Sequence, residues 1–414
     1  MKNRTKIDNE EKSTRLSREA KILLLVGGLF TTATSLSGTF VNVYLWRAKN
    51  DLSMIGVFNL FQFIFIPIAF YLAGRMTKAR PASLCLRIGL LLHMAFFLLI
   101  LASRGNAPTF VIPLGTLLGL AAGFYWSAYQ ILTYDLTSRM NRDTYNSILG
   151  IIFSASNIIT PVASGYIISK MPQFSGYRLI FMISAAIYTA VWLISLMMTA
   201  KPLDRPVELF KCWRSAASVW RYTLLGHYFF GIRNGVLMFL VNLLILISGG
   251  NEFTIGKLAM AASIVSAISF SLLEKILKPK RRILLFTIGA VMMLVSVSFL
   301  VFDTNLFTLL AYGLLNALFA PFFQVPFDSA TLNVIDKNVN QSRTEYIILK
   351  EFSLNAGRIT GVLIFLTLTR QESPTLMRIL LLTVGSIHLT LLLFRKKLDF
   401  DVDVTKNRVN IKNK

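Results

Sequence analysis

The stretch from Val41-Asn42-Val43 to Ile55-Gly56 decides the fold, because it occurs twice. It returns as Val241-Asn242-Leu243 and Ile255-Gly256, and it is accompanied by Asn50-Asp51 with Asn251-Glu252 and by Gly74-Arg75-Met76-Thr77-Lys78 with Glu274-Lys275-Ile276-Leu277-Lys278. The members of each pair are about 200 residues apart, within one residue, in a chain of 414. Four matches in one order at one spacing indicate two related halves. A period this long is typical of halves that share a fold and enclose something between them.

The composition indicates a membrane protein. Hydrophobic residues make up 54% of the chain, charged residues only 15%, and the mean hydropathy is +0.60, whereas a soluble domain is about one quarter charged. The net charge of +23 is therefore assigned to Lys and Arg in cytoplasmic loops, and nucleic acid is not expected as a partner. Two cysteines, Cys85 and Cys212, are too few for a disulfide framework and are predicted to be free thiols.

Charge-poor runs long enough to cross a bilayer occur twelve times. The predicted spans are 22–45, 52–74, 82–103, 107–134, 144–169 and 179–200, then 222–251, 253–273, 283–302, 304–335, 345–369 and 374–394. Long continuous apolar runs predict helices rather than the strands of a barrel. The predicted domains are a tail (1–21), a six-helix half (22–200), a central loop (201–221), a second six-helix half (222–394) and a tail (395–414).

The distribution of Lys and Arg predicts the orientation. With the N-terminus inside, the inner segments hold 33 of the 43 basic residues and the outer loops hold 8. Such a bias predicts that both termini are cytoplasmic. The short loops suit a bacterial cell membrane.

Two pseudo-symmetric six-helix halves, a basic central loop and internal termini resemble the major facilitator superfamily of secondary transporters. The resemblance implies an all-α integral membrane fold, alternating access to a central site, and a monomer. The family's loop between helices 2 and 3 reads G-x-x-x-D-R/K-x-G-R/K-R/K. Here Arg75 and Lys78 keep the basic places, while Gly74 takes the acidic one.

In the family this loop latches the two halves on the cytoplasmic side. The resemblance implies a pairing of Arg75 with Asp135 at the end of helix 4. The copy of this motif in the second half keeps both the acidic and the basic residues, as Glu274, Lys275 and Lys278. The alternative interpretation is that these residues are ordinary positive-inside charges.

Helix 5 carries a second partial match, to the exporter pattern g-x-x-x-G-P-x-x-G-G. This chain keeps Pro161 and Gly165 and has small residues at the other places. The match favours efflux, but close packing of helices explains small residues and a proline equally well.

Charged residues inside predicted spans are the first candidates for a transport site, because a charge in the hydrocarbon is costly. The second half contains four of them: Arg233, Asp328, Glu351 and Arg358. Asp328 and Glu351 are the candidates for proton coupling, and Arg233 and Arg358 are candidates for contact with the solute. Glu351 and Arg358 share one helix face, since they are seven residues apart. The alternative is a structural pair in which Asp328 or Glu351 neutralises Arg358.

Polar and aromatic residues of facing helices are the second group of candidates for the wall of a cavity. These are Asn42, Asn157, Asn242, Trp126, Tyr129, Gln130 and Gln324. An aromatic run in a membrane helix is more often turned towards lipid or used in packing.

No P-loop, H-E-x-x-H or C-x-x-C pattern occurs, so an enzyme, a metal site or a cofactor is not expected. The leading hypothesis is a secondary transporter that exports small amphipathic molecules, with protons as a possible coupling ion. The first alternative is uptake or exchange of an anionic organic solute. The second is a non-transporting receptor or scaffold on a transporter fold.

Overall fold

The computed structural model describes residues 16–103, 105–137, 141–199, 209–215, 218–337, 343–369 and 373–400. The helices of the first half are α2 (Arg18–Lys49), α3 (Leu52–Met76), α4 (Ala82–Ala102), α5 (Val111–Leu136), α6 (Arg142–Lys170) and α7 (Ser175–Ser195). A short α8 (Leu209–Ser215) is followed by α9 (Ser218–Ile247), α10 (Glu252–Ile276), α11 (Arg282–Phe302), α12 (Leu306–Lys337), α13 (Arg343–Thr369) and α14 (Pro374–Ser386). Twelve helices of the described chain are long and apolar enough to cross a membrane, as the sequence predicted.

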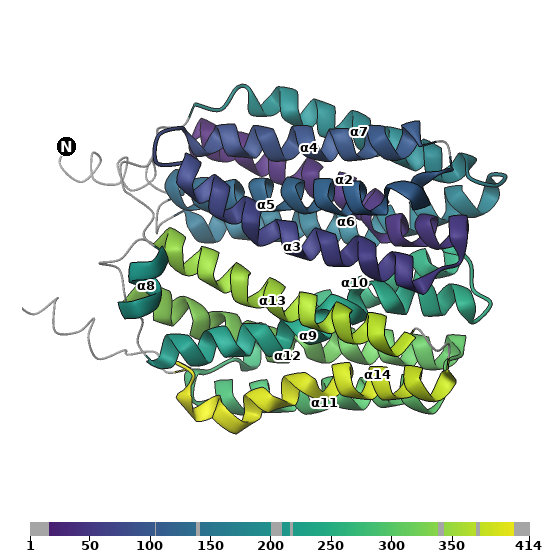
Figure 1. Cartoon of the computed structure of the whole chain (residues 1–414). Coiled ribbons are helices and arrows are strands. Elements are labelled where there is room, and N and C mark those ends of the chain that lie inside the picture. Colours follow the sequence, from purple (N-terminus) through teal and green to yellow (C-terminus); the bar gives the residue numbers. More distant parts are fainter. Residues whose placement is uncertain are drawn as a thin grey trace, which may run out of the picture.

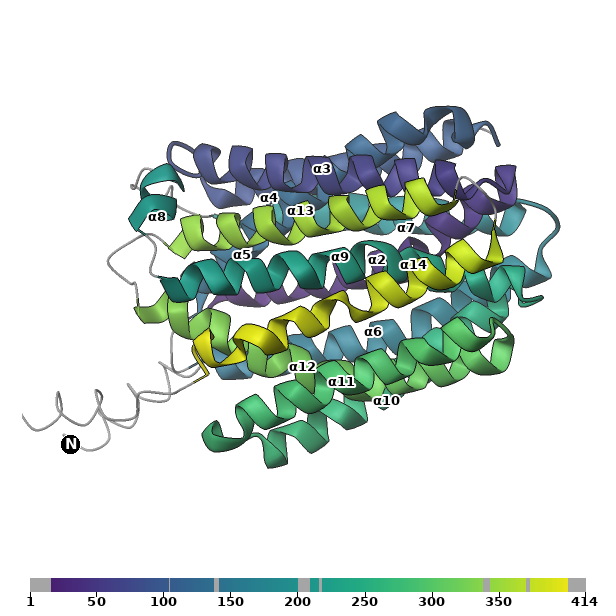
Figure 2. The ribbon, with the colours of Figure 1, turned by 60° about the horizontal axis from the view of Figure 1, so that its bottom comes forward.

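The two halves lie side by side, with α2 to α7 in one group and α9 to α14 in the other (Figure 1). In the turned view, α13 lies beside α3 and α6 lies near α10, where the halves meet (Figure 2). Because the helices alternate in direction, the start of α2 and the end of α3 lie near α8, and this end of the bundle is called the α8 end. The opposite end, where α2 ends at Lys49 and α10 begins at Glu252, is called the far end. Each half has six spanning helices, which is consistent with the two-halves arrangement expected from the sequence.

Part of the repeated sequence forms the same local structure in both halves, the start of a helix after a tight turn. The Asp51 carboxylate accepts a hydrogen bond from the Met54 backbone N–H at 3.1 Å and caps α3. The Asn251 side chain accepts one from the Thr254 N–H at 2.9 Å and caps α10. These two N-caps are 200 residues apart. Glu252 therefore stands where the first half has Leu52, and it is left free for another contact.

Glycines of the repeat lie where the two halves cross, α3 against α13 and α6 against α10. A Cβ atom on Gly56 would lie 2.5 Å from the Leu366 side chain, and one on Gly256 would meet the backbone oxygen of Pro161. Small residues let helix backbones approach closely in a membrane, where association depends on packing. The motif Ile-Gly thus recurs because each half needs one such crossing.

The α3–α13 crossing is close at both ends of the bundle. At the α8 end, a Cβ on Gly74 would lie 2.6 Å from Ile348 of α13. Between α6 and α10, Ser263 donates to the Asn157 backbone oxygen at 3.1 Å. Towards the α8 end from there, Gly150 is exposed, with no heavy atom within 4 Å of a Cβ placed on it.

Most helix boundaries differ from the predicted spans by a few residues, and two of the differences have an identifiable cause. The helix expected at 179–200 runs over Ser175–Ser195, because uncharged residues after Lys170 begin the helix before Arg178. The polar tail predicted to begin at Arg395 is partly packed. A 3-10 helix, η3 (Ile387–Lys397), continues α14, and Leu398 and Phe400 are buried. Residues 1–15, 200–208 and 401–414 of the predicted tails and central loop lie outside the described residues.

Candidate functional site

A cavity of about 710 Å³ lies between the two halves. Its wall comes from all six helices of the first half, α2 to α7, and from α9 and α13 in the second. The predicted site residues that line it are Asn42, Trp126, Gln130, Asn157, Asn242, Glu351 and Arg358. Asn42 and Asn242 are the two asparagines of the repeat, so the duplicated sequence contributes one carboxamide from each half.

Arg358 projects into the cavity from α13 with few partners. One terminal nitrogen (Nη1) donates to the Asn355 side-chain oxygen at 3.2 Å, and the guanidinium lies 5.3 Å from the centre of the Phe63 ring. Its Nε is buried and has no hydrogen-bond partner among the described residues. Arg358 therefore retains donor capacity towards the cavity.

Glu351 lines the cavity two helical turns before Arg358. One carboxylate oxygen lies 3.3 Å from the Lys350 ammonium, and the other accepts a long hydrogen bond from the Asn355 amide at 3.5 Å. Glu351 thus has its own cation and reaches Arg358 only through Asn355. The sequence analysis missed Lys350, because a lysine near the start of a span is also what the positive-inside rule produces.

The other predicted site residues lie outside the cavity lining. Arg233 is 3% exposed and donates to the Asn316 side chain at 2.7 Å within the second half. The Tyr129 hydroxyl is buried against that of Tyr145 at 2.9 Å. Asp328 is exposed and Gln324 is half-buried on α12, and neither lines the cavity.

The apolar wall is aromatic, and sequence reasoning found only part of it. Phe30 is 1% exposed and stacks on Tyr125 with 3.4 Å between ring centres, while Trp126 and Tyr188 meet it edge to face at 5.6 Å each. Phe58, Phe63, Phe96 and Phe97 also line the cavity. No sequence signal separated these residues from lipid-facing phenylalanines. The ring contacts fix the shape of the wall before any solute arrives.

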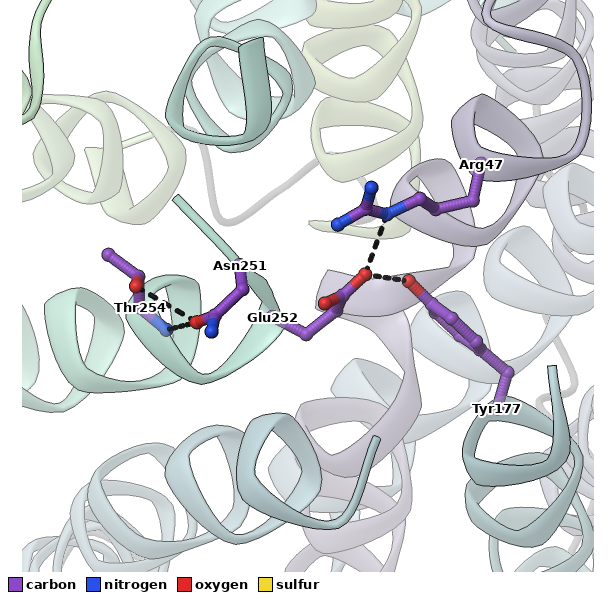
Figure 3. A network of polar contacts seen from close by, with 5 residues as sticks. All are labelled: Arg47, Tyr177, Asn251, Glu252 and Thr254. Carbon is purple, nitrogen blue, oxygen red and sulfur yellow. Dashed lines mark hydrogen bonds and ion pairs between the residues drawn. The ribbon is translucent and has the colours of Figure 1, made fainter. Parts of the chain in front are cut away.

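At the far end, an ion pair joins the two halves (Figure 3). The Arg47 Nε of α2 donates to Glu252 Oε1 of α10 at 2.8 Å, and the Tyr177 hydroxyl of α7 donates to the same oxygen at 2.7 Å. The Glu252 side chain is 9% exposed and that of Arg47 is 43% exposed. This tie was not predicted. The sequence feature that could have indicated this ion pair is Glu252, an acid in the second copy of the repeat at the place where the first copy has Leu52.

At the α8 end, the predicted latch residues are separate. Arg75 is exposed and contacts Tyr71, with 3.5 Å between Nη1 and the hydroxyl. Asp135 is exposed, and no ion pair joins it to Arg75. Glu274, Lys275 and Lys278 are exposed and outside the described ion pairs.

A different contact joins the halves at the α8 end. The guanidinium of Arg343 at the start of α13 lies 4.3 Å from the centre of the Tyr134 ring at the end of α5. Arg142 of α6 lies at the same distance from that ring, and Arg343 also pairs with Asp336 at 2.7 Å. A cation on an aromatic face contributes about 0.5–1 kcal/mol at such exposed sites.

The partial exporter pattern of α6 lies in the seam between the halves. The Pro161 backbone oxygen faces Gly256, and a Cβ on Gly165 would meet the backbone oxygen of Glu252. Close packing of α6 on α10 accounts for both residues. From this seam to the α8 end, Asn146, Gly150 and Asn157 lie along one exposed face of α6, which continues into the cavity at Asn157.

The comparisons with known proteins agree with this architecture. The family model of the Major Facilitator Superfamily matches residues 23–349. The chain belongs to this superfamily. YqgE of Bacillus subtilis (strain 168) is 32% identical over 348 residues, which cover 83% of this chain and 81% of YqgE. A protein of the sodM 3′ region of Geobacillus stearothermophilus is 36% identical over 168 residues, 41% of this chain and 78% of that protein.

Solved transporter structures of the superfamily share the fold at low sequence identity. The nucleoside transporter NupG superimposes with a TM-score of 0.67 at 13% identity, over 92% of this chain and 99% of NupG. A bacterial homologue of the iron transporter ferroportin gives 0.67 at 15%, over 92% and 98%. A D-xylose-proton symporter gives 0.68 at 14%, over 93% and 98%. The cargoes of these neighbours differ in chemistry, so the fold alone selects none.

Proposed function

We propose that this chain is a secondary active transporter that exports a small amphipathic organic molecule in exchange for protons. One observation carries the proposal, which is the cavity of about 710 Å³ between the halves, walled by aromatic rings and carboxamides. Sites at the interface of two repeats near the middle of the bilayer are where such transporters bind their cargo. A polar, charged wall in this place is costly unless it has a function.

The orientation proposed from the basic loops places the α8 end in the cytoplasm of the cell membrane. The close contacts of α6 with α10 then block the outer side, and the exposed face of α6 leads from the cavity towards the cytoplasm. The described conformation would accordingly admit solute from inside. The exporter-like pattern of α6 favours efflux as the direction.

Glu351 is the better supported of the two candidates for proton coupling. It lines the cavity and pairs with Lys350 at 3.3 Å, whereas Asp328 does not line the cavity. A carboxylate that both protons and solute can reach can bind them alternately.

The test is solute-driven proton flux in proteoliposomes loaded with a pH-sensitive dye. A panel of lipophilic cations, neutral amphiphiles and organic anions would be added to the wild-type protein, Glu351→Gln and Asp328→Asn. We expect flux with at least one compound, a loss of about tenfold or more in Glu351→Gln, and near wild-type flux in Asp328→Asn. Full flux in Glu351→Gln would remove that residue from coupling. Absence of proton flux in the wild-type protein with every compound would favour a receptor or scaffold on the transporter fold.

A second candidate function is uptake or exchange of an anionic solute. The observation that favours it is Arg358 in the cavity wall with an unused Nε. The direction separates the candidates. Vesicles preloaded with solute should release it under an inward proton gradient if the protein exports, and empty vesicles should accumulate it if the protein imports.

A further inference from the structure

Arg358 is a cation in the cavity wall without a carboxylate beside it. Among the described residues, its contacts are the Asn355 side-chain oxygen at 3.2 Å and the Phe63 ring at 5.3 Å. Both are uncharged, and an Arg on an aromatic ring gains only about 0.5–2 kcal/mol. Removing an ion from water costs several kcal/mol unless an opposite charge and hydrogen bonds replace the water. The guanidinium of Arg358 therefore lacks an anion in direct contact with it.

The one acid in the cavity lining, Glu351, acts on Arg358 electrostatically but is shared with a second cation and does not contact it. Glu351 pairs with Lys350 at 3.3 Å, and Asn355 stands between Glu351 and Arg358. Counted together, Glu351 and Lys350 are neutral, and Arg358 adds one positive charge. The other polar groups of the lining are carboxamides, such as those of Asn42, Asn157 and Asn242, hydroxyls, and the ring nitrogens of His93 and Trp126.

From this we infer that the cargo is a small organic monoanion with a planar, apolar body. Its anionic group binds Arg358. The inference deepens the proposed transport function and rests on it. The terminal nitrogens of Arg358 offer donors in one plane, which suits a carboxylate or a similar flat anionic group. A cationic cargo would meet the same positive charge without a free acid to offset it.

The shape of the cargo follows from the rest of the wall. Phe63 lies beside the guanidinium, and Phe30, Phe96 and Trp126 continue the aromatic surface. Flat apolar bodies gain from stacking and edge contacts with such rings. The carboxamides of Asn42 and Asn242, one from each half, can accept or donate hydrogen bonds to a polar substituent. Arg358 is the one Lys or Arg among the described residues that line the cavity, so a dianion would leave one charge unpaired.

Binding of three compounds that share one ring system and differ in charge tests this inference directly. The probes are 1-naphthoate, 1-naphthamide and 1-naphthylmethylammonium, measured by isothermal titration on the full chain in lipid nanodiscs. We expect 1-naphthoate to bind at least about tenfold more tightly than the amide, with the ammonium compound weakest. In Arg358→Gln the naphthoate and the amide should bind equally, whereas Arg358→Lys should keep part of the preference.

Arg233→Gln is the matched control, because Arg233 is also buried but donates to Asn316 outside the cavity lining. It should keep the full preference for the anion. The inference is overturned if the ammonium compound binds most tightly, if none of the three probes binds at millimolar concentration, or if Arg358→Gln retains the preference. A protein that binds 1-naphthoate without moving any solute would instead refute the proposed transport and leave the ligand class standing.

Discussion

The Arg47 guanidinium of the first half and the Glu252 carboxylate of the second half lie 2.8 Å apart at the far end of the bundle (Figure 3). Positions displaced by 200 residues from Arg47, Tyr177 and Glu252 are Ile247, Met377 and Leu52. The two outer edges of the interface thus use different chemistry, a hydrogen-bonded ion pair on one side and apolar side chains on the other. Only the polar edge can respond to charge.

Glu252→Gln should weaken the closure of the far end. The amide keeps one hydrogen-bond acceptor but loses the charge that Arg47 binds, at a cost of about 1 kcal/mol for a partly exposed pair. The population that is open at the far end should rise about fivefold. Spin-label distances between the far ends of α6 and α10 would measure it. Asp51→Asn is the control, because it removes one acid at the matching turn but Asn still caps α3. A shift of equal size in Asp51→Asn would contradict the specific role of Glu252.

Gly256→Ala should destabilise the contact of α10 with α6. The added Cβ meets the Pro161 backbone oxygen, which cannot rotate away as a side chain can. Overpacking of this kind costs about 1–3 kcal/mol, so the thermal unfolding midpoint in detergent should fall by a few degrees. Gly150→Ala serves as the comparison, since nothing lies within 4 Å of its added Cβ. Equal midpoints for the two variants would show that the crossing is looser than described.

A cysteine at Gly150 should react with a water-soluble thiol reagent, and one at Ile151 should not. Both positions are exposed, Ile151 to 70%. Gly150, however, shares a helix face with Asn157 of the cavity wall, whereas Ile151 is one residue farther around the helix. The native Cys85 and Cys212 are buried and give a low background. Labelling of the Ile151 variant at the same rate would mean that this face of α6 is turned to water rather than to lipid.

Phe400→Ala should destabilise the second half. Phe400 is 2% exposed and packs on Phe286 with 5.2 Å between ring centres, and its backbone oxygen accepts from Arg282. Truncation of a buried Phe costs about 3–5 kcal/mol. Denaturant unfolding followed by tryptophan fluorescence would report the loss. Phe302→Ala, which removes a ring that is 81% exposed, should cost far less. Comparable losses would place Phe400 outside the core.

The helices could be predicted from the sequence because hydrocarbon demands long runs without charge, and the two halves because the repeat keeps its glycines and caps. The cavity was predicted only in part. Arg358 and Arg233 are both arginines deep in spans, but depth does not fix which way a helix face turns. Arg358 reaches the cavity and Arg233 reaches Asn316. The Tyr134–Arg343 contact could not be predicted, because it joins side chains at helix ends whose relative position only the packed fold defines.

The α3–α13 crossing, which is tight at Gly56 and again at Gly74, gives the two halves a common axis of rotation. Contacts near a hinge change little when the bodies turn, whereas those at the opposite edge change most. The opposite edge is the α6–α10 side, where the Arg47–Glu252 bond joins the two halves at the far end. Rotation about the α3–α13 crossing would therefore separate the two halves mainly along the α6–α10 side, and contacts on that side would set how far the cavity opens.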